Sequence, residues 1–147
     1  MPEFLELHGR TNKAIRALAD TAMRRHGLHE GQNVLLAVLW TTDGATPGEI
    51  AAKLRVTTPT VVKMATRMTT AGLLTRRRDD KDNRLVRLWL TDAGRALQEP
   101  VETARQEIEE KVTAGLTEAE HKHLMSALAK VNAAASELLA EAGSGRA

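Results

Sequence analysis

The stretch that decides the fold covers residues 46–91 and reads TPGEIAAKLRVTTPTVVKMATRMTTAGLLTRRRDDKDNRLVRLWLT. Its first part predicts a short helix. Thr46 is followed by Pro47 and, three residues after the threonine, by Glu49, which is the pattern of a capping box with proline in the first helical turn. The apolar residues that follow share one helical face: Ile50, Ala51 and Leu54.

A second helix is predicted directly after the first. Thr58 can cap it and Pro59 can begin it. Its inward stripe is apolar: Val61, Val62, Ala65 and Met68. Its outward face carries a hydroxyl, a methionine and two cations: Thr60, Lys63, Met64 and Arg67. A helix in the major groove of DNA needs such a face, because cations meet phosphates or guanine edges and small side chains let the backbone approach. Gly72 is expected to end this helix.

After Gly72 the period of the apolar residues changes to two, which is typical of a half-buried strand. Val86, Leu88 and Leu90 alternate with polar or amphipathic neighbours, and a partner strand is expected over about residues 74–78. The intervening residues 79–83, DDKDN, favour a turn. The hairpin collects six cations: Arg76, Arg77, Arg78, Lys81, Arg84 and Arg87.

An arginine at the tip of such a hairpin can enter the narrow minor groove, where the negative potential of DNA is strongest. Arg84 is the candidate for this insertion, and Asp82 is expected to orient it or a neighbouring arginine. Two helices followed by a basic hairpin are the plan of a winged helix-turn-helix, a module that reads duplex DNA.

The hairpin also resembles the wing signature of the multiple antibiotic resistance regulator (MarR) family. The residues that carry the resemblance are Gly72-Leu73-Leu74, Arg76, Asp79, Asp82, Arg84, Leu88, Leu90-Thr91 and Gly94. It extends over nearly the whole chain, since the flanking helices fall where that family has them. The resemblance implies a mainly α fold (an α+β winged helix) of about six helices with a two-stranded β-wing. It also implies a repressor that a small-molecule effector releases from its operator.

The helices expected before and after the stretch of residues 46–91 cover about residues 2–26, 29–40, 91–112 and 117–140. Pro100 falls inside the third of these and is expected to kink the helix rather than split it, because the apolar stripe continues in phase. The stripes of the terminal helices have no partner within a small winged domain, which predicts a homodimer. A two-fold dimer places two recognition helices roughly 34 Å apart and reads a palindromic operator.

The domain plan that follows is a single domain over residues 1–147. Residues 1–28 and 92–142 form the dimerisation helices, and residues 29–91 form the winged helix-turn-helix. The net charge of +2 does not by itself indicate a nucleic-acid partner, but the distribution of charge along the chain does indicate one. Residues 46–90 carry ten Lys/Arg and four Asp/Glu, whereas residues 91–147 carry six and ten. This layout directs the winged module toward phosphates and keeps the C-terminal helices away from them.

Several other classes of protein find no support in the sequence. The chain has no cysteine, which excludes disulfides and thiol-based sensing. His121 and His123 have the wrong helical spacing for a metal pair, and no catalytic motif is present, so we expect no metal site, no cofactor and no enzyme. No apolar run approaches the roughly 18 residues of a membrane-spanning helix, and no signal-peptide core is present, so we expect a cytoplasmic protein.

The resemblance also implies where an effector would bind, namely between the dimerisation helices and the winged module. The candidates at that junction are Ala14, Arg16, Leu18, Ala22, Leu36 and Trp40. The alternative for each is an ordinary place in the core. Trp40 is the best of them, because it ends its helix close to the module.

The residues expected to contact DNA are Lys53, Thr58, Pro59, Thr60, Lys63, Met64, Arg67, Arg76, Arg78, Arg84 and Arg87. Arg76, Arg78, Lys53 and Arg87 are expected to hold phosphates or to brace the wing. Rival hypotheses are a winged module that binds an acidic protein, a metal-responsive regulator, and a small-molecule carrier or enzyme without a DNA function.

Overall fold

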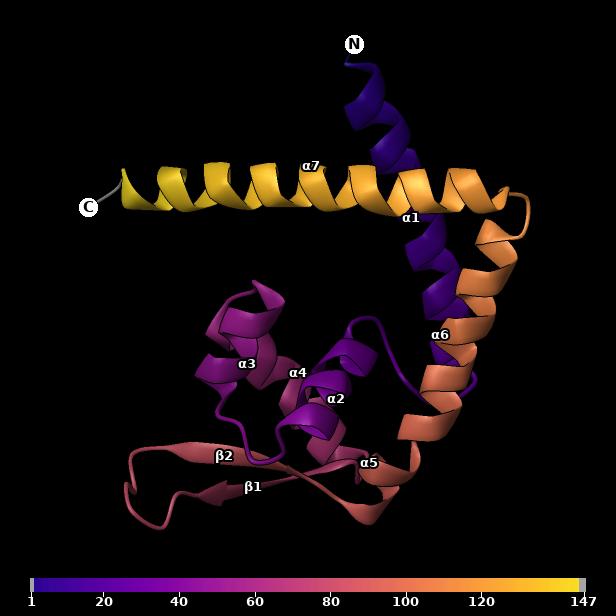
Figure 1. Ribbon diagram of the computed structural model, residues 1–147. Coiled ribbons are helices and arrows are strands. Elements are labelled where there is room, and N and C mark those ends of the chain that lie inside the picture. The colour runs from indigo at the N-terminus through magenta and orange to yellow at the C-terminus, as the bar shows by residue number, and fades with distance from the viewer. Residues whose placement is uncertain (1, 146–147) are drawn as a thin grey trace. The chain divides into compact units, whose positions relative to one another are not determined.

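Seven helices and one hairpin make up residues 2–145, which the computed structural model describes (Figure 1). In chain order the elements are α1 (Glu3–Arg24), α2 (Gln32–Thr41), α3 (Pro47–Leu54), α4 (Thr58–Thr70), β1 (Leu74–Arg78), β2 (Val86–Leu90), α5 (Asp92–Ala96), α6 (Gln98–Thr113) and α7 (Glu118–Ser144). The chain forms two compact units, the first reaching Ile108 and the second starting at Glu109. The predicted fold class, mainly helical with a two-stranded wing, is confirmed.

The start of α3 is the capping box that the sequence predicts. The Thr46 hydroxyl accepts a hydrogen bond from the backbone N–H of Glu49 at 3.2 Å, and the Glu49 carboxylate accepts one from the N–H of Thr46 at 3.2 Å. These bonds satisfy two donors that a helix start leaves free. Inside the helix, Ile50 and Ala51 are buried, as expected from the apolar face.

The start of α4 differs from the prediction by one residue. Thr57, not Thr58, is the N-cap, and its hydroxyl accepts a hydrogen bond from the N–H of Thr60 at 3.3 Å. Thr58 and Pro59 then occupy the first two helical positions. Two adjacent threonines are equally able to cap a helix, so local sequence does not choose between them.

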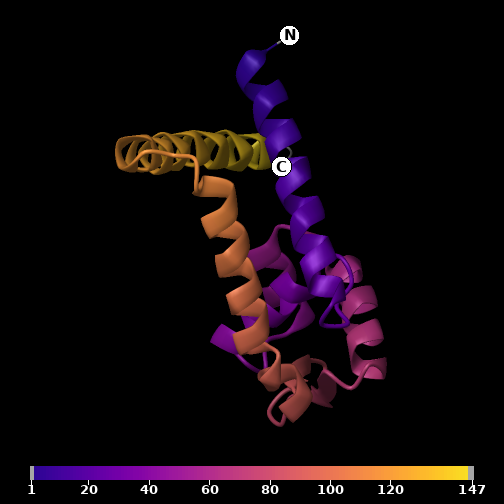
Figure 2. The same ribbon diagram turned by 90° about the vertical axis from the view of Figure 1, so that its right-hand side faces the viewer.

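The wing is an antiparallel hairpin at the end of the first unit opposite the N-terminal part of α1 (Figures 1 and 2). Leu74 pairs with Leu90, Arg76 with Leu88, and Arg78 with Val86. Both strands cover the predicted residues. Leu74, Leu88 and Leu90 are buried, which fixes the register, because a shift by one residue would expose all three.

One hydrophobic core joins the wing to the helices of the first unit. Its largest fully buried side chains come from the end of α1 and the loop after it, from α2 to α4, from the wing and from α6: Met23, Leu28, Leu35, Leu36, Leu39, Ile50, Val61, Met68, Leu74, Leu88 and Val101. The α2–α4 group and the base of the wing therefore fold as one body.

The long helix expected after the wing is split rather than kinked. It divides at Leu97 into α5 and α6, upstream of Pro100, so our preference for a kink was wrong. Pro100 lies in the first turn of α6, where the missing N–H of a proline costs no intrahelical bond. A proline in a first helical turn favours a new start over a continuous helix.

The second unit consists mainly of α7, which opens with the predicted capping box of Thr117 and Glu120. This helix buries none of its residues, and its apolar side chains are between two fifths and two thirds exposed: Leu124, Met125, Leu128, Val131, Leu138 and Leu139. The N-terminal part of α1 likewise exposes Phe4, Leu5 and Leu7. None of the helices in residues 2–145 is both long and apolar enough to span a membrane.

Candidate nucleic-acid interface

The outward face of α4 is accessible and basic. Thr58, Pro59, Thr60, Lys63 and Arg67 are all exposed, and Lys53 is exposed on the preceding helix α3. Thr60, Lys63 and Arg67 recur at intervals of three and four residues, so they share one face of the helix. The opposite face holds Val61, Ala65 and Met68 in the core. This packing fixes the direction in which the basic face points.

Met64 was predicted to face outward with these residues, but it is not fully exposed. It is half-buried and packs against the core, and a Cβ placed on Gly31 would lie 3.2 Å from its Cε. Val62, predicted to point inward, is likewise only half-buried. The buried stripe of α4 therefore consists of Val61, Ala65 and Met68, and Val62 and Met64 lie at its two edges. Met64 contributes to packing.

The tip of the wing presents Arg84 to solvent. Its side chain is 90% exposed, and its Nε and Nη2 donate to the two carboxylate oxygens of Asp82 at 3.0 and 3.2 Å. The Asp82 carboxylate also accepts from the backbone N–H of Arg84 at 3.1 Å. Hydrogen bonds from the side chain and the backbone of Arg84 hold the pKa of Asp82 below its ordinary value, so they favour the charged carboxylate. The expectation that Asp82 orients Arg84 is confirmed.

A second ion pair lies where the turn of the wing meets the two strands. The Arg87 Nε donates to Asp79 Oδ1 at 2.8 Å, and its Nη1 donates to the backbone oxygen of Gly44 at 2.9 Å. Both side chains are partly covered, at 30% exposure for Arg87 and 20% for Asp79. Of the two roles expected for Arg87, phosphate binding or bracing, the contacts favour bracing.

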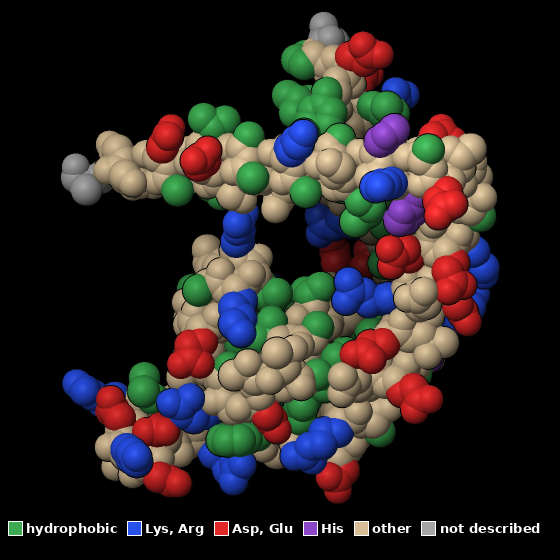
Figure 3. All heavy atoms as spheres, in the orientation of Figure 1, with side chains coloured by type: hydrophobic (Ala, Val, Ile, Leu, Met, Phe, Trp, Pro, Cys, Tyr) green, Lys and Arg blue, Asp and Glu red, His purple; other side chains and the backbone are tan. Residues whose placement is uncertain are grey.

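The remaining wing arginines divide between solvent and protein. Arg76 and Arg78 are exposed, and Arg78 donates to the backbone oxygen of Asn83 at 3.0 Å. Arg77 lies over the ring of Trp89, 4.7 Å from its centroid, which is a cation–π contact. Figure 3 shows the Lys and Arg side chains of the wing interspersed with Asp and Glu side chains.

Sequence reasoning missed the loop before α3 as a part of this interface. Asp43 accepts hydrogen bonds from the N–H of Gly44 at 3.1 Å and of Leu90 at 2.9 Å, and Leu88 donates to the oxygen of Ala45 at 3.0 Å. Residues 43–45 thus run along β2. The sequence marks Asp43-Gly44 only as a turn, because a partner more than forty residues away leaves no local signal.

The candidate effector residues lie in different surroundings. Leu36 is fully buried in the core, and Trp40 is half-buried and donates from Nε1 to the oxygen of Gly94 at 3.0 Å. Ala22 packs against the core, whereas Ala14 and Leu18 are exposed on α1. Arg16 is exposed as well and lies 3.4 Å from Glu30.

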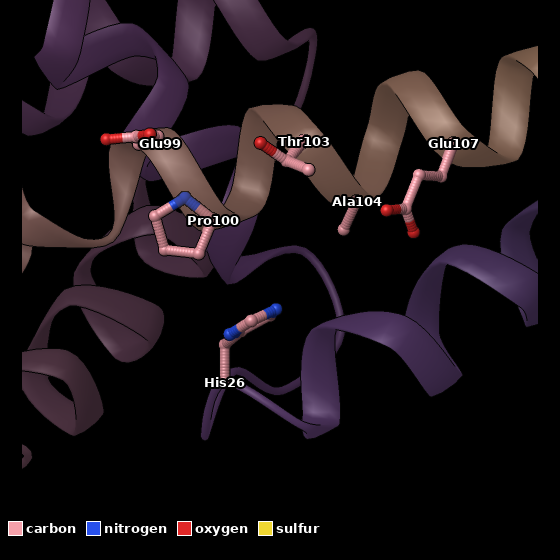
Figure 4. Close-up of a pocket in the computed structure, with 6 residues that line it drawn as sticks. All are labelled: His26, Glu99, Pro100, Thr103, Ala104 and Glu107. Carbon is pink, nitrogen blue, oxygen red and sulfur yellow. The ribbon is translucent and has the colours of Figure 1, made fainter.

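A cavity of about 380 Å³ lies instead between the turn after α1 and the first turns of α6. In Figure 4 the His26 ring lies across from Pro100 and Ala104 of α6. The other lining residues are Glu99, Thr103 and Glu107. None of these residues belongs to the predicted set. Among residues 2–145, no three His, Cys, Asp or Glu side chains are grouped so that they could hold a metal ion.

Comparisons with known proteins agree with this geometry. The sequence pattern of the MarR family matches residues 28–86. The HTH-type transcriptional regulator TtmR of Methylorubrum extorquens is 31% identical over 122 residues, which cover 83% of this chain and 60% of TtmR. The chain thus spans less than two thirds of the length of the curated relatives that it matches.

Solved structures show the same fold. A probable transcriptional regulator from Pseudomonas aeruginosa superposes with a TM-score of 0.79 at 25% identity, over 88% of this chain and 97% of that one. The MepR–DNA complex from S. aureus gives a TM-score of 0.81 at 25% identity, over 89% of this chain and 97% of MepR. With its capped helix pair, its basic wing and these likenesses, the chain belongs to the MarR family.

Proposed function

We propose that this protein is a transcriptional regulator that binds duplex DNA as a homodimer. In this proposal it represses a palindromic operator, and a small-molecule effector releases it. The observation that carries the proposal is the exposed guanidinium of Arg84, held by Asp82 at the tip of a wing that shares a core with α4. A fixed, exposed arginine on a thin hairpin suits a narrow minor groove, while α4 supplies a basic face for the major groove.

Likeness to regulators supports DNA binding over catalysis. TtmR is named as a transcriptional regulator, and MepR was solved in complex with DNA. The DNA contacts that we propose for this chain come from α3, α4 and the wing: Lys53, Thr58, Pro59, Thr60, Lys63, Arg67, Arg76, Arg78 and Arg84. Met64 and Arg87 act behind this surface, through packing and bracing. A cytoplasmic location, where the operator would lie, remains part of the proposal.

The homodimer is supported by the apolar side chains that α1 and α7 leave in solvent. An exposed apolar helix face commonly marks a protein–protein interface. The proposed dimerisation regions, residues 1–28 and 92–142, include both helices. Two wings and two α4 helices related by a two-fold axis would read the two halves of a palindrome.

For the effector, the cavity beside His26 is a second candidate site beside the six residues at the junction of the dimerisation helices and the winged module, of which Arg16 lines a hollow of about 370 Å³. The volume of the cavity beside His26, about 380 Å³, lies within the usual range of small-molecule sites. Of the six, Leu36 packs in the core, and Trp40 is half-buried and donates a hydrogen bond to the oxygen of Gly94.

The test is fluorescence anisotropy of a labelled duplex that covers the DNA upstream of the protein's own coding region, at two salt concentrations. A scrambled duplex of equal length is the control. We expect saturation at one dimer per site, tighter binding than to the control, and an affinity that falls steeply as salt rises, because phosphate contacts release counterions. If neither duplex binds at either salt concentration, the proposal fails, and an acidic protein becomes the better partner for the basic face.

A further inference from the structure

We propose that Asp79 is a positioning residue for DNA binding, which fixes the wing although its own charge repels phosphates. The inference rests on the proposed function, because it concerns how the wing is held for that task. It reverses the simple expectation for an acidic side chain in a basic, DNA-binding hairpin, namely that removal of the negative charge strengthens binding.

Both carboxylate oxygens of Asp79 are engaged inside the hairpin. Oδ1 accepts from Arg87 Nε at 2.8 Å, and Oδ2 accepts from the backbone N–H groups of Asp82 at 2.9 Å and Lys81 at 3.2 Å. The backbone N–H of Asp79 donates to the oxygen of Leu85 at 2.9 Å. One side chain therefore closes the turn that carries Arg84 and also ties that turn to β2.

Arg87 continues the connection from the wing to the helix pair. Its Nη1 donates to the oxygen of Gly44, and Leu88 donates to the oxygen of Ala45, directly before the Thr46 cap of α3. Gly44 has φ +78°, and a Cβ at this position would lie 2.5 Å from the Trp89 ring. The loop is thus pressed against β2, and the chain of contacts from Asp79 through Arg87 to Gly44 joins the wing tip to the start of α3.

The charge state of Asp79 suits this role. The hydrogen bond from Arg87 is the largest cause that holds the pKa of Asp79 below its ordinary value, followed by the one from the Asp82 backbone. The carboxylate is therefore ionised at neutral pH, and it uses a cation, Arg87, that could otherwise face phosphates. Because this negative charge opposes the attraction between the wing and phosphates, its function is to hold the wing in position.

The neighbouring Asp80 offers a matched control. It is exposed, and it makes no side-chain hydrogen bond or ion pair with any residue that the structure describes. Asp79→Asn and Asp80→Asn raise the net charge by the same amount at adjacent positions. An asparagine at position 79 places an NH₂ group where one carboxylate oxygen stood, and this group cannot accept from Arg87 or from the backbone N–H groups.

The experiment measures DNA affinity against salt for the wild type and the two variants. We expect Asp80→Asn to bind about twofold more tightly, the size of one exposed charge effect. Asp79→Asn should bind roughly tenfold more weakly, the size of a lost groove contact. Its slope of log affinity against log salt should also fall by about 0.9, as for one phosphate that is no longer neutralised, which mere loss of folded protein would not cause.

Limited trypsin digestion without DNA supplies an independent measurement, because the wing is rich in arginine. We expect faster cleavage within residues 76–87 for Asp79→Asn than for Asp80→Asn, at equal thermal stability. If both variants bind more tightly and are cleaved at the same rate, Asp79 does not position the wing and the inference is overturned. If the wild type binds no duplex, the proposed function fails, and the cleavage rates alone decide whether Asp79 holds the wing.

Discussion

At the scale of single residues, Arg84 is the side chain on which DNA affinity should depend most. The Asp82 carboxylate orients it while its side chain stays 90% exposed, so little protein contact is lost when it is removed. Arg84→Ala should weaken operator binding on the order of tenfold to a hundredfold, as for other groove-contacting arginines. Anisotropy titration measures this, with circular dichroism to verify the fold.

The matched control for this prediction is Arg84→Lys. It keeps the positive charge but loses the forked donors that meet both oxygens of Asp82. A lysine variant between the wild type and alanine would separate charge from orientation. Equal affinity of all three proteins would show that the wing tip does not touch DNA.

The residues of the interface differ in how well the sequence predicts them. The exposure of Lys63, Arg67 and Arg84 follows from the helical period and from the turn, which are local patterns. The role of Arg87 depends on Gly44, a contact across 43 residues of chain, which no local pattern contains. Leu36 shows the same limit, since the sequence offers both a pocket wall and an ordinary core position for it, and only its packing in the fold shows that it is fully buried.

At the scale of elements, the two threonines before Pro59 have separable tasks. Thr57 caps α4, whereas Thr58 is the first helical residue and is exposed. Thr57→Ala should lower the free energy of unfolding by about 1 kcal/mol, the usual worth of an N-cap. Thr58→Ala should leave stability nearly unchanged and act on DNA affinity instead. Urea unfolding measures the free energy of unfolding of both variants. A larger decrease for Thr58→Ala than for Thr57→Ala would show that Thr58 is the N-cap, as the sequence suggested.

The bounds of the helices and strands were predicted well where the local sequence pattern is strong and poorly where it is weak. The strands agree to the residue, because alternation and a turn-forming DDKDN define both ends. The break at Leu97 was missed, because the apolar stripe from Leu97 to Val112 continues in phase past Pro100, which predicts one continuous helix. The stripe places no constraint on the residues before Leu97, and Leu97 itself keeps right-handed helical dihedral angles where α5 ends.

At the scale of the whole molecule, α7 is the element whose surface most requires a partner. Leu128 lies in the middle of its apolar stripe and is 42% exposed. Leu128→Glu should therefore shift the protein from dimer to monomer, because a carboxylate cannot be buried unpaired in an apolar interface without a large cost. Ser126→Glu, two residues away and on the other side of the helix, should leave the dimer intact. Light scattering at several protein concentrations measures both, and an unchanged Leu128→Glu dimer would exclude this stripe as the interface.

The two tryptophans have a practical consequence, because the chain contains no tyrosine. Trp40 is hydrogen-bonded to Gly94, just beyond β2, and Trp89 lies in β2 between Arg77 and the Gly44 loop. Every indole in the protein therefore lies where the wing meets the helices. The near-ultraviolet light that the native chain absorbs and emits comes almost entirely from that junction, so its emission spectrum is an unlabelled optical gauge of wing movement.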